Sequence, residues 1–212
     1  MASTFEKMDR MYRFQRCFYD LTRKFYLLGR DRLICEMKIS QGDRVLEAGC
    51  GTGRNLIVLA KKYPEAEFFG LDASAAMLDT AEARSAGIAN IRLQTALADD
   101  FGHDKTFGLN AAFDVIYFSY SISMIPPWRE SIENALANLK PGGRLYFVDF
   151  YDQAGLPVWF RKLLQAWLRQ FHVKYPAELP GYLRRLEKEG RGTLNFRGLY
   201  GRYSFIAEFE KA

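Results

Sequence analysis

Two acidic residues and three alternating glycines stand at positions where this chain could bind a nucleotide-like ligand. Gly49, Gly51 and Gly53 follow Glu47, and this pattern predicts a strand that ends in a glycine-rich turn before a helix. In an α/β sheet, such a ligand lies at the carboxyl ends of the strands. Asp72 ends the next predicted strand, 19 positions beyond Gly53, where a carboxylate can accept hydrogen bonds from ribose hydroxyls. A helix cap is the alternative role for Asp72.

The glycine spacing excludes the dinucleotide fingerprint, which requires glycine where this chain has Arg54. Alternating glycines with an acid two residues ahead instead resemble the first motif of class I methyltransferases. That resemblance implies the cofactor S-adenosylmethionine, with Glu47 near its methionyl end. The cofactor-binding residues that we expect are Tyr19, Glu47, Gly49, Cys50, Gly51, Thr52, Gly53, Asn55, Asp72, Ala73, Met77, Leu97, Ala98, Ser119, Tyr120 and Met124.

The same resemblance implies an α/β, Rossmann-like class I methyltransferase fold. We expect a seven-stranded, mostly parallel sheet that ends in an antiparallel hairpin. After the first strand, the apolar runs predict strands over residues 67–72, 91–95, 113–119 and 145–150, and a hairpin over 193–199 and 202–210. The intervening patterns predict helices over 55–63, 74–86 and 128–139, with a tight turn over 140–144.

The loop after the third strand reaches the adenine in related methyltransferases, often with an acid directly after the strand. Here that position is Ala96, and the acids follow at Asp99 and Asp100. We expect Leu97 and Ala98 to pack near the adenine ring.

The end of the fourth strand argues against some acceptors. Methyltransferases of nucleobases and of protein glutamine place Asp or Asn before a Pro-Pro pair there. Pro126 and Pro127 form such a pair, but neither Asp nor Asn precedes it. Amide and exocyclic base amines are therefore disfavoured as substrates.

Length and composition fit a globular protein with a single α/β domain over 1–212. We divide it into a helical lid (1–40), a cofactor-binding core (41–153), a basic amphipathic insertion (154–192) and a terminal hairpin (193–212). Three cysteines without metal-site spacing suggest a reducing compartment, and two isolated histidines predict no metal site. The first residues lack the apolar region of a secretory signal, and we expect a cytoplasmic protein.

Positive charge is concentrated in two segments. Residues 1–32 carry eight Lys or Arg against four Asp or Glu, and residues 154–192 carry eight against three. This pattern suits an anionic partner, either membrane or nucleic acid, although two solvated helix faces would give the same surplus. Residues 159–171 also form a Trp-, Phe- and Leu-rich stripe opposite basic residues, which is typical of an interfacial membrane helix. A helix packed on the core is the alternative.

The N-terminal run over 8–13 and 19–32 resembles the bacterial methyltransferase of betaine-lipid synthesis, and the resemblance extends over nearly the whole chain, including 202–205. It implies N-methylation of diacylglycerylhomoserine to diacylglyceryl-trimethylhomoserine. The implied partners are a lipid-amine substrate and an anionic membrane surface, with no nucleic acid. The implied location is the inner face of the cytoplasmic membrane, with peripheral attachment.

This resemblance also suggests residue roles. A carboxylate or tyrosine near the amine could accept its proton, and aromatic faces could contact the cationic product. The catalytic candidates are Tyr19, Tyr26, Asp149 and Tyr151. An arginine could bind the homoserine carboxylate bidentately. The substrate-binding candidates are Tyr12, Arg23 and Arg30.

Three other functions are compatible with parts of the sequence. A methyltransferase of phosphatidylethanolamine or of a quinone precursor would share the glycine motif and Asp72. A nucleic-acid methyltransferase would explain the pI of 9.1 and would bind in a salt-sensitive manner. A non-catalytic scaffold would keep the fold, but the intact Glu47, glycine loop and Asp72 argue against lost cofactor binding.

Overall fold

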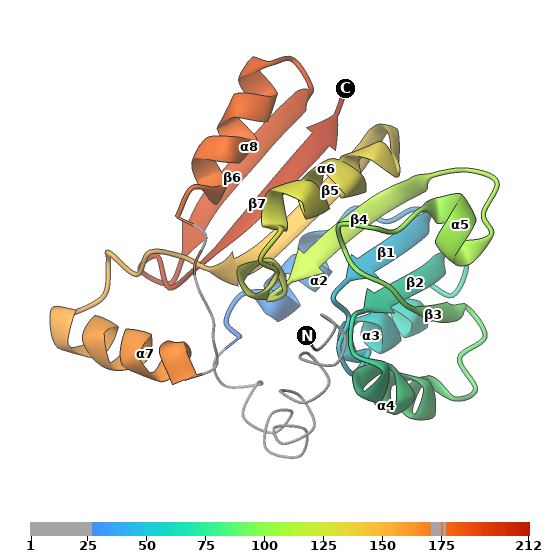
Figure 1. Cartoon of the computed structure of the whole chain (residues 1–212), viewed down its shortest axis with the longest axis horizontal. Helices are drawn as coiled ribbons and strands as arrows, with labels where there is room; N and C mark the ends of the chain where they lie inside the picture. Colours follow the sequence, from blue (N-terminus) through green and yellow to red (C-terminus); the bar gives the residue numbers. More distant parts are fainter. Residues whose placement is uncertain (1–26, 171–174, 176) are drawn as a thin grey trace, which may run out of the picture.

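A seven-stranded sheet forms the centre of the protein in the computed structural model, which describes residues 27–170, 175 and 177–212 (Figure 1). The strand order is β3-β2-β1-β4-β5-β7-β6. The first five strands are parallel neighbours, and β7 is antiparallel to both β5 and β6. The strands are β1 (Arg44–Ala48), β2 (Glu67–Asp72), β3 (Ile91–Thr95), β4 (Phe113–Ser119), β5 (Leu139–Phe150), β6 (Gly192–Leu199) and β7 (Ser204–Lys211).

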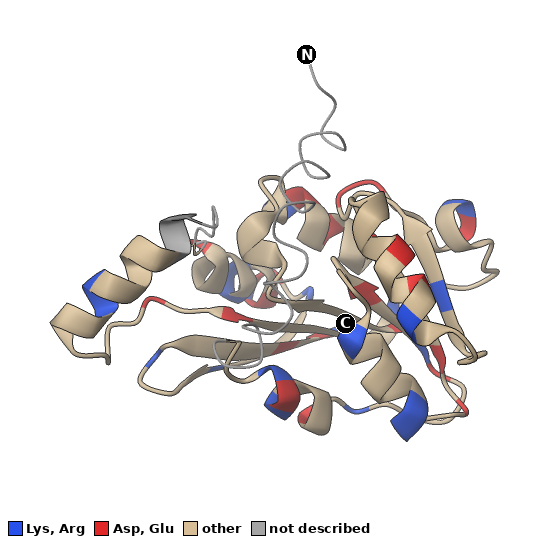
Figure 2. Cartoon of the chain, turned by 90° about the horizontal axis from the view of Figure 1, so that it is seen from below, with Lys and Arg blue, Asp and Glu red and all other residues tan. Residues whose placement is uncertain are grey.

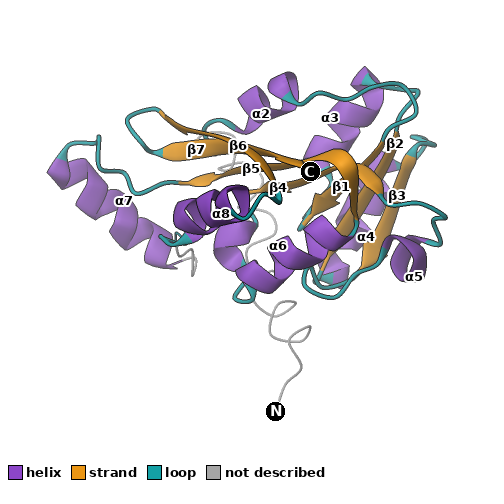
Figure 3. Cartoon of the chain, turned by 90° about the horizontal axis from the view of Figure 1, so that it is seen from above, coloured by secondary structure: helices purple, strands orange, loops and turns teal. Residues whose placement is uncertain are grey.

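Helices cover both faces of the sheet. In Figure 3, α2 and α3 lie on one face while α6 and α8 lie on the other. The described helices are α2 (Arg30–Glu36), α3 (Arg54–Lys62), α4 (Ala75–Ser85), α5 (His103–Phe107), α6 (Trp128–Ala137), α7 (Val158–Gln170) and α8 (Leu179–Lys188), with a 3₁₀ helix, η1 (Ile122–Met124).

Two apolar cores lie on the two faces, because the side chains of a covered parallel strand are buried on both sides. On the α6 and α8 face, Phe118 and Phe147 stack with ring centroids 5.4 Å apart, and Leu183 belongs to the same cluster. On the α2, α3 and α4 face, Leu56 and Val115 belong to the second cluster. Both faces of the sheet are therefore covered by packed apolar side chains, and the loops that form the cavity start from this buried core.

The class I methyltransferase fold predicted from the sequence is confirmed, and the predicted bounds of β2, β3 and β4 are those of the structure. The predicted turn over 140–144 is wrong, because β5 begins at Leu139 and includes it. The strand pairing nevertheless shifts there, from Phe113 opposite Leu139 to Val115 opposite Arg144.

The segment over 154–192 contains two helices, of which the sequence predicted one. Leu183 and Leu186 of α8 are fully buried, and α8 packs against β6. In contrast, α7 extends beyond the end of β5 (Figure 1) and buries Leu164, while Trp167 packs partly on the core. Residues 1–26 of the predicted helical lid lie outside the described residues. In the described part of the lid, α2 ends at Glu36, before the predicted boundary at residue 40.

Candidate active site

A cavity of about 580 Å³ opens at the carboxyl ends of β1, β2, β3 and β4, as expected for this class of sheet. Its wall combines backbone of the glycine loop with acidic, basic and apolar side chains. The lining residues are Leu27, Arg30, Glu47, Gly49, Cys50, Gly51, Thr52, Arg54, Asn55, Leu71, Asp72, Ala73, Met77, Arg84, Ala96, Leu97, Ala98, Asp99, Ser119, Tyr120, Ser121, Met124, Ile125, Pro126 and Pro127.

The glycine loop joins β1 to α3 in a conformation that side chains would prevent. Gly49 has φ 77°, and a Cβ there would lie 2.6 Å from Cβ of Ser121. The hydroxyl of Ser121 donates to the carbonyl of Ala48 at 2.7 Å, which ties the loop after β4 to the end of β1. Gly53 does not line the cavity: it caps α3, and a Cβ there would lie 3.0 Å from Ala81. Gly53 therefore serves helix packing, and its contact with the cofactor stays a prediction.

Glu47 is held at the end of β1 by two side-chain donors. Asn55 Nδ2 donates to Oε1 at 2.7 Å, and the hydroxyl of Tyr117 donates to Oε2 at 3.0 Å. The carboxyl group is almost fully buried yet lines the cavity. Burial raises the pKa of the Cys50 thiol well above its usual value, and the charges of Asp72 and Glu47 raise it further. The floor of the cavity is therefore electronegative and suits a cationic group.

Asp72 ends β2 and accepts two backbone hydrogen bonds. The N–H of Gly51 donates to Oδ2 at 2.8 Å, and the N–H of Ser74 donates to Oδ1 at 2.9 Å. Ser74 itself caps α4, because its hydroxyl accepts from the N–H of Met77 at 3.4 Å. The capping role that the sequence left open for Asp72 thus belongs to Ser74, and Asp72 is oriented toward the cavity between the glycine loop and α4.

The loop after β3 forms another part of the wall. Leu97 and Ala98 line the cavity as expected, and Ala96 and Asp99 join them. From the sequence, Asp99 was noted only as an acid that lies three residues after Ala96, the position where related methyltransferases often have an acid. Because Asp99 reaches the cavity, a carboxylate is available in this loop after all.

The loop after β4 contributes a strained tyrosine. Tyr120 has φ 55°, which is uncommon for a residue with a side chain, and its hydroxyl donates to the carbonyl of Leu28 at 2.5 Å. Burial raises the pKa of Tyr120 well above its usual value, and the charge of Asp149 adds to this. The hydroxyl therefore remains protonated and fastens the segment before α2 to the cavity.

Arg30 is the described substrate-binding candidate that lines the cavity. Its side chain is nearly buried at the start of α2, and its charge lowers the pKa of Tyr120, which places the two side chains near each other. Arg54 and Arg84 also line the cavity and were not predicted from the sequence. All three arginines have partners: Arg30 Nε lies 3.7 Å from Asp31 Oδ1, and Arg54 Nη1 lies 2.5 Å from the same oxygen. Arg84 Nη1 donates to Thr52 Oγ1 at 3.0 Å.

Asp149 and Tyr151 do not line the cavity, so their positions give no support to a direct catalytic role. Asp149 is fully buried and accepts from the N–H groups of Ser123 at 3.0 Å and Phe150 at 2.7 Å. It therefore holds η1, the helix that brings Met124 to the cavity.

Tyr151 packs away from the cavity, in an aromatic cluster with Tyr175, Phe196 and Phe205. The predicted residues Tyr12, Tyr19, Arg23 and Tyr26 lie outside the described residues.

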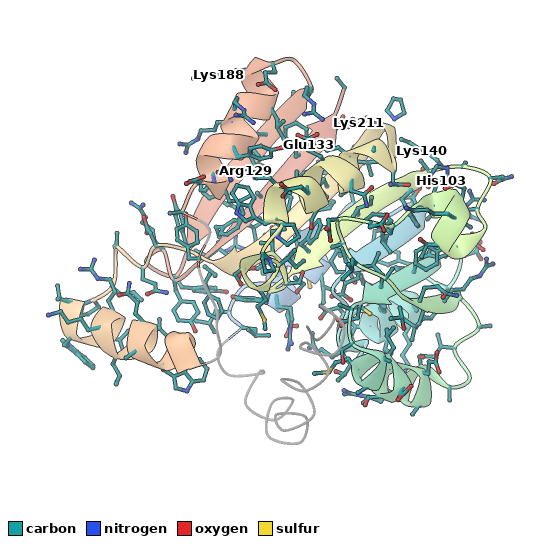
Figure 4. The ribbon with its side chains drawn as sticks, in the orientation of Figure 1. His103, Arg129, Glu133, Lys140, Lys188 and Lys211 are labelled. Atoms are coloured by element: carbon teal, nitrogen blue, oxygen red, sulfur yellow. The ribbon has the colours of Figure 1, made fainter. Side chains whose placement is uncertain are left out.

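Neither a metal cluster nor a membrane span is found in the part of the chain that the structure describes. No group of three or more His, Cys, Asp or Glu side chains there could hold a metal ion. His103 lies on α5 (Figure 4) and does not line the cavity; its Nδ1 is 2.9 Å from Asn138 Oδ1. No described helix is long and apolar enough to cross a bilayer.

The family model described as a methyltransferase domain matches residues 16–185, most of the chain. The chain belongs to this methyltransferase family. Its cofactor is accordingly S-adenosylmethionine, which supplies a methyl group activated by a sulfonium. The cavity fits this cofactor: Glu47 would face its cationic methionyl end and Asp72 its ribose, while Leu97 and Ala98 would pack beside the adenine.

Two curated relatives and one solved structure illustrate the breadth of this methyltransferase family. A trans-aconitate 2-methyltransferase of Deinococcus radiodurans is 31% identical over 48% of this chain and 36% of its own length. A demethylmenaquinone methyltransferase of Staphylococcus carnosus is 30% identical over 54% of this chain and 46% of its own. The chain thus aligns with less than half of either relative.

Fold similarity extends further than sequence similarity. A crystal structure of an S-adenosylmethionine-dependent methyltransferase from Thermotoga maritima has a TM-score of 0.69 and covers 97% of this chain and 100% of its own. The two share 16% sequence identity. At that identity the likeness concerns the fold alone, and the acceptor has to be inferred from this chain.

Proposed function

We propose that this methyltransferase methylates the amine of a lipid headgroup, with diacylglycerylhomoserine as the acceptor and diacylglyceryl-trimethylhomoserine as the product. The observation that carries the proposal is the position of Arg30, a nearly buried arginine in the wall of the cofactor cavity. Arg30 belongs to the N-terminal run that resembles the betaine-lipid enzyme.

Arg30 suits an acceptor that carries a carboxylate close to its amine. A guanidinium binds a carboxylate through two parallel hydrogen bonds, and such bonds are stronger where water is excluded. Leu27 and Ile125 line the same cavity and offer apolar contacts to the carbon chain of a headgroup. Together these side chains would hold the amine in a defined orientation.

The main task of the protein in this reaction is to hold the acceptor amine in line with the methyl group of S-adenosylmethionine. The neutral amine attacks the transferable methyl carbon in line, as the carbon–sulfur bond breaks. Each transfer leaves a cationic nitrogen, which must lose a proton before the next transfer. Tyr120 is unsuited to accept that proton because its own hydroxyl stays protonated and donates to Leu28. Tyr19 and Tyr26 remain the predicted candidates.

The acceptor can be tested with the purified protein, labelled S-adenosylmethionine and a panel of acceptors. The panel contains diacylglycerylhomoserine, phosphatidylethanolamine and demethylmenaquinone in detergent micelles, and trans-aconitate in buffer. We expect label in diacylglycerylhomoserine, with little in phosphatidylethanolamine because its headgroup lacks the carboxylate that Arg30 would bind. Label confined to any other acceptor would overturn the proposal.

Demethylmenaquinone is the second candidate, favoured by the similarity to the Staphylococcus carnosus relative over 54% of this chain. It has no carboxylate for Arg30 to bind, and it would be methylated on carbon. Mass spectrometry of the labelled lipid distinguishes the two products, because the two acceptors differ in mass.

A further inference from the structure

Exposed apolar side chains gather at one end of the sheet. Among the described residues, seven large apolar side chains are exposed, and six of them belong to three short segments. These six form what we call the apolar edge: Leu28, Val158, Trp159, Phe160, Leu163 and Tyr200. The seventh, Val58, lies on α3. Trp159 is 71% exposed and Leu163 is 62% exposed, although large apolar side chains are usually buried.

The three segments of the apolar edge adjoin one another. A Cβ on Gly29 would lie 2.9 Å from Cδ1 of Leu199, so the segment of Leu28 packs beside the turn between β6 and β7. A Cβ on Gly155 would lie 2.7 Å from the carbonyl oxygen of Gly201, so that turn also touches the segment leading into α7. The three segments that carry these exposed side chains are thus neighbours in the fold. A cluster of exposed apolar side chains marks an interaction site.

The charge of α7 indicates the kind of partner. Residues 158–170 include three basic residues and no acidic residue. Figure 2 shows this helix at the left of the view with blue and no red in its described part. Arg161 is partly exposed and Lys162 is exposed, within one turn of Trp159. Trp, Phe and Leu beside Lys and Arg on one helix are typical of segments that lie in the interface of an anionic bilayer.

We propose that the apolar edge docks on the surface of an anionic lipid bilayer, with α7 in the interfacial region. The edge also adjoins the cavity, because Leu27 and Arg30 line the cavity and flank Leu28. Docking would therefore bring the bilayer next to the wall where a lipid headgroup enters. This last step rests on the proposed lipid acceptor, whereas docking itself rests on the apolar edge and the basic residues of α7.

Vesicle sedimentation tests docking without any activity measurement. The full chain is mixed with vesicles of phosphatidylglycerol and phosphatidylcholine, and Trp159→Ser/Leu163→Ser is compared with the control Val58→Ser on α3. We expect binding by the wild type and by Val58→Ser. The double variant should bind at least about tenfold more weakly, since two side chains lose their burial in the bilayer. Binding should also weaken as salt rises.

A separate assay distinguishes failed docking from a wrong acceptor. Methylation of a short-chain, water-soluble diacylglycerylhomoserine needs no bilayer, so the double variant should match the wild type there and lose rate on vesicle-embedded substrate. Equal vesicle binding by the wild type and the double variant would overturn docking. So would a wild-type oligomer that the double variant dissolves, because the edge would then join two copies of the chain.

Discussion

The backbone N–H of Gly51 donates a hydrogen bond to the Asp72 carboxylate at 2.8 Å, linking the glycine loop after β1 to the end of β2. A second N–H, from Ser74, fixes the other carboxylate oxygen. These two contacts orient the Asp72 side chain. Each carboxylate oxygen can accept more than one hydrogen bond, so both can still accept from ribose hydroxyls. Asp72 therefore shapes the loop and serves as the ribose acid that we infer.

Asp72→Asn should weaken the binding of S-adenosylmethionine. An amide can replace one oxygen acceptor only, and loss of a charge-assisted hydrogen bond costs about 1.5–3 kcal/mol, roughly ten- to hundredfold in Kd. Isothermal titration calorimetry measures this change. The matched control is Asp79→Asn, an exposed aspartate on α4, which should bind like the wild type. If Asp72→Asn binds as tightly as Asp79→Asn, the ribose assignment is wrong.

Glu47→Gln tests which end of the cofactor this carboxylate meets. Asn55 and Tyr117 can still bond a neutral glutamine, because the tyrosine oxygen can accept from the new amide, so the fold should survive. We expect S-adenosylmethionine and S-adenosylhomocysteine to bind roughly tenfold more weakly, and to the same extent, because both carry the amino group of the methionyl end. A loss restricted to S-adenosylmethionine would instead place Glu47 against the sulfonium.

Arg30→Lys should raise the KM of a carboxylate-bearing acceptor about tenfold or more, since lysine cannot reproduce the bidentate pairing. The KM of S-adenosylmethionine should change little. Arg32→Lys is the control, because Arg32 is exposed on the same helix and pairs with Glu36. Steady-state kinetics with each substrate varied in turn give both values. Equal increases in the two KM values would remove Arg30 from the acceptor site.

Asp149 should make stability depend on pH. Burial raises its pKa from 3.8 to about 6, while hydrogen bonds from Ser123 and Phe150 oppose the rise. The folded state then binds a proton more tightly than the unfolded state, so stability from this group is highest below about pH 4. It falls by up to roughly 3 kcal/mol as the pH rises to about 6, and stays constant above that.

Urea unfolding of the wild type and of Asp149→Asn from pH 4 to 8 isolates this effect. The free energy of unfolding of the wild type minus that of Asp149→Asn should fall between about pH 4 and 6, as described for Asp149. Other carboxylates contribute equally to both proteins and cancel in this difference. A pH-independent difference for Asp149→Asn would show that Asp149 is not protonated in the folded protein at low pH.

The sequence predicted best those features that depend on neighbouring residues, such as buried strands and residues at a fixed spacing from the glycines. The apolar runs within β2 and β4 made their bounds predictable, whereas β5 begins six residues before the run that predicted it. Glu47 and Asp72 followed from their spacing to the glycines. Asp149 was less predictable, because its place beneath η1 depends on how the loop after β4 folds back. Arg54 and Arg84 were missed because helix residues reach the cavity only through the relative placement of α3 and α4.

The acceptor assignment is tested most directly by counting the methyl groups added to one lipid. Purified protein is incubated with diacylglycerylhomoserine and S-adenosylmethionine whose methyl group is deuterated, and the lipid is examined by mass spectrometry. The account predicts successive products with one, two and three deuterated methyl groups, all on the homoserine nitrogen. Unmodified diacylglycerylhomoserine, in a reaction where the same protein methylates another acceptor of the panel, would contradict it.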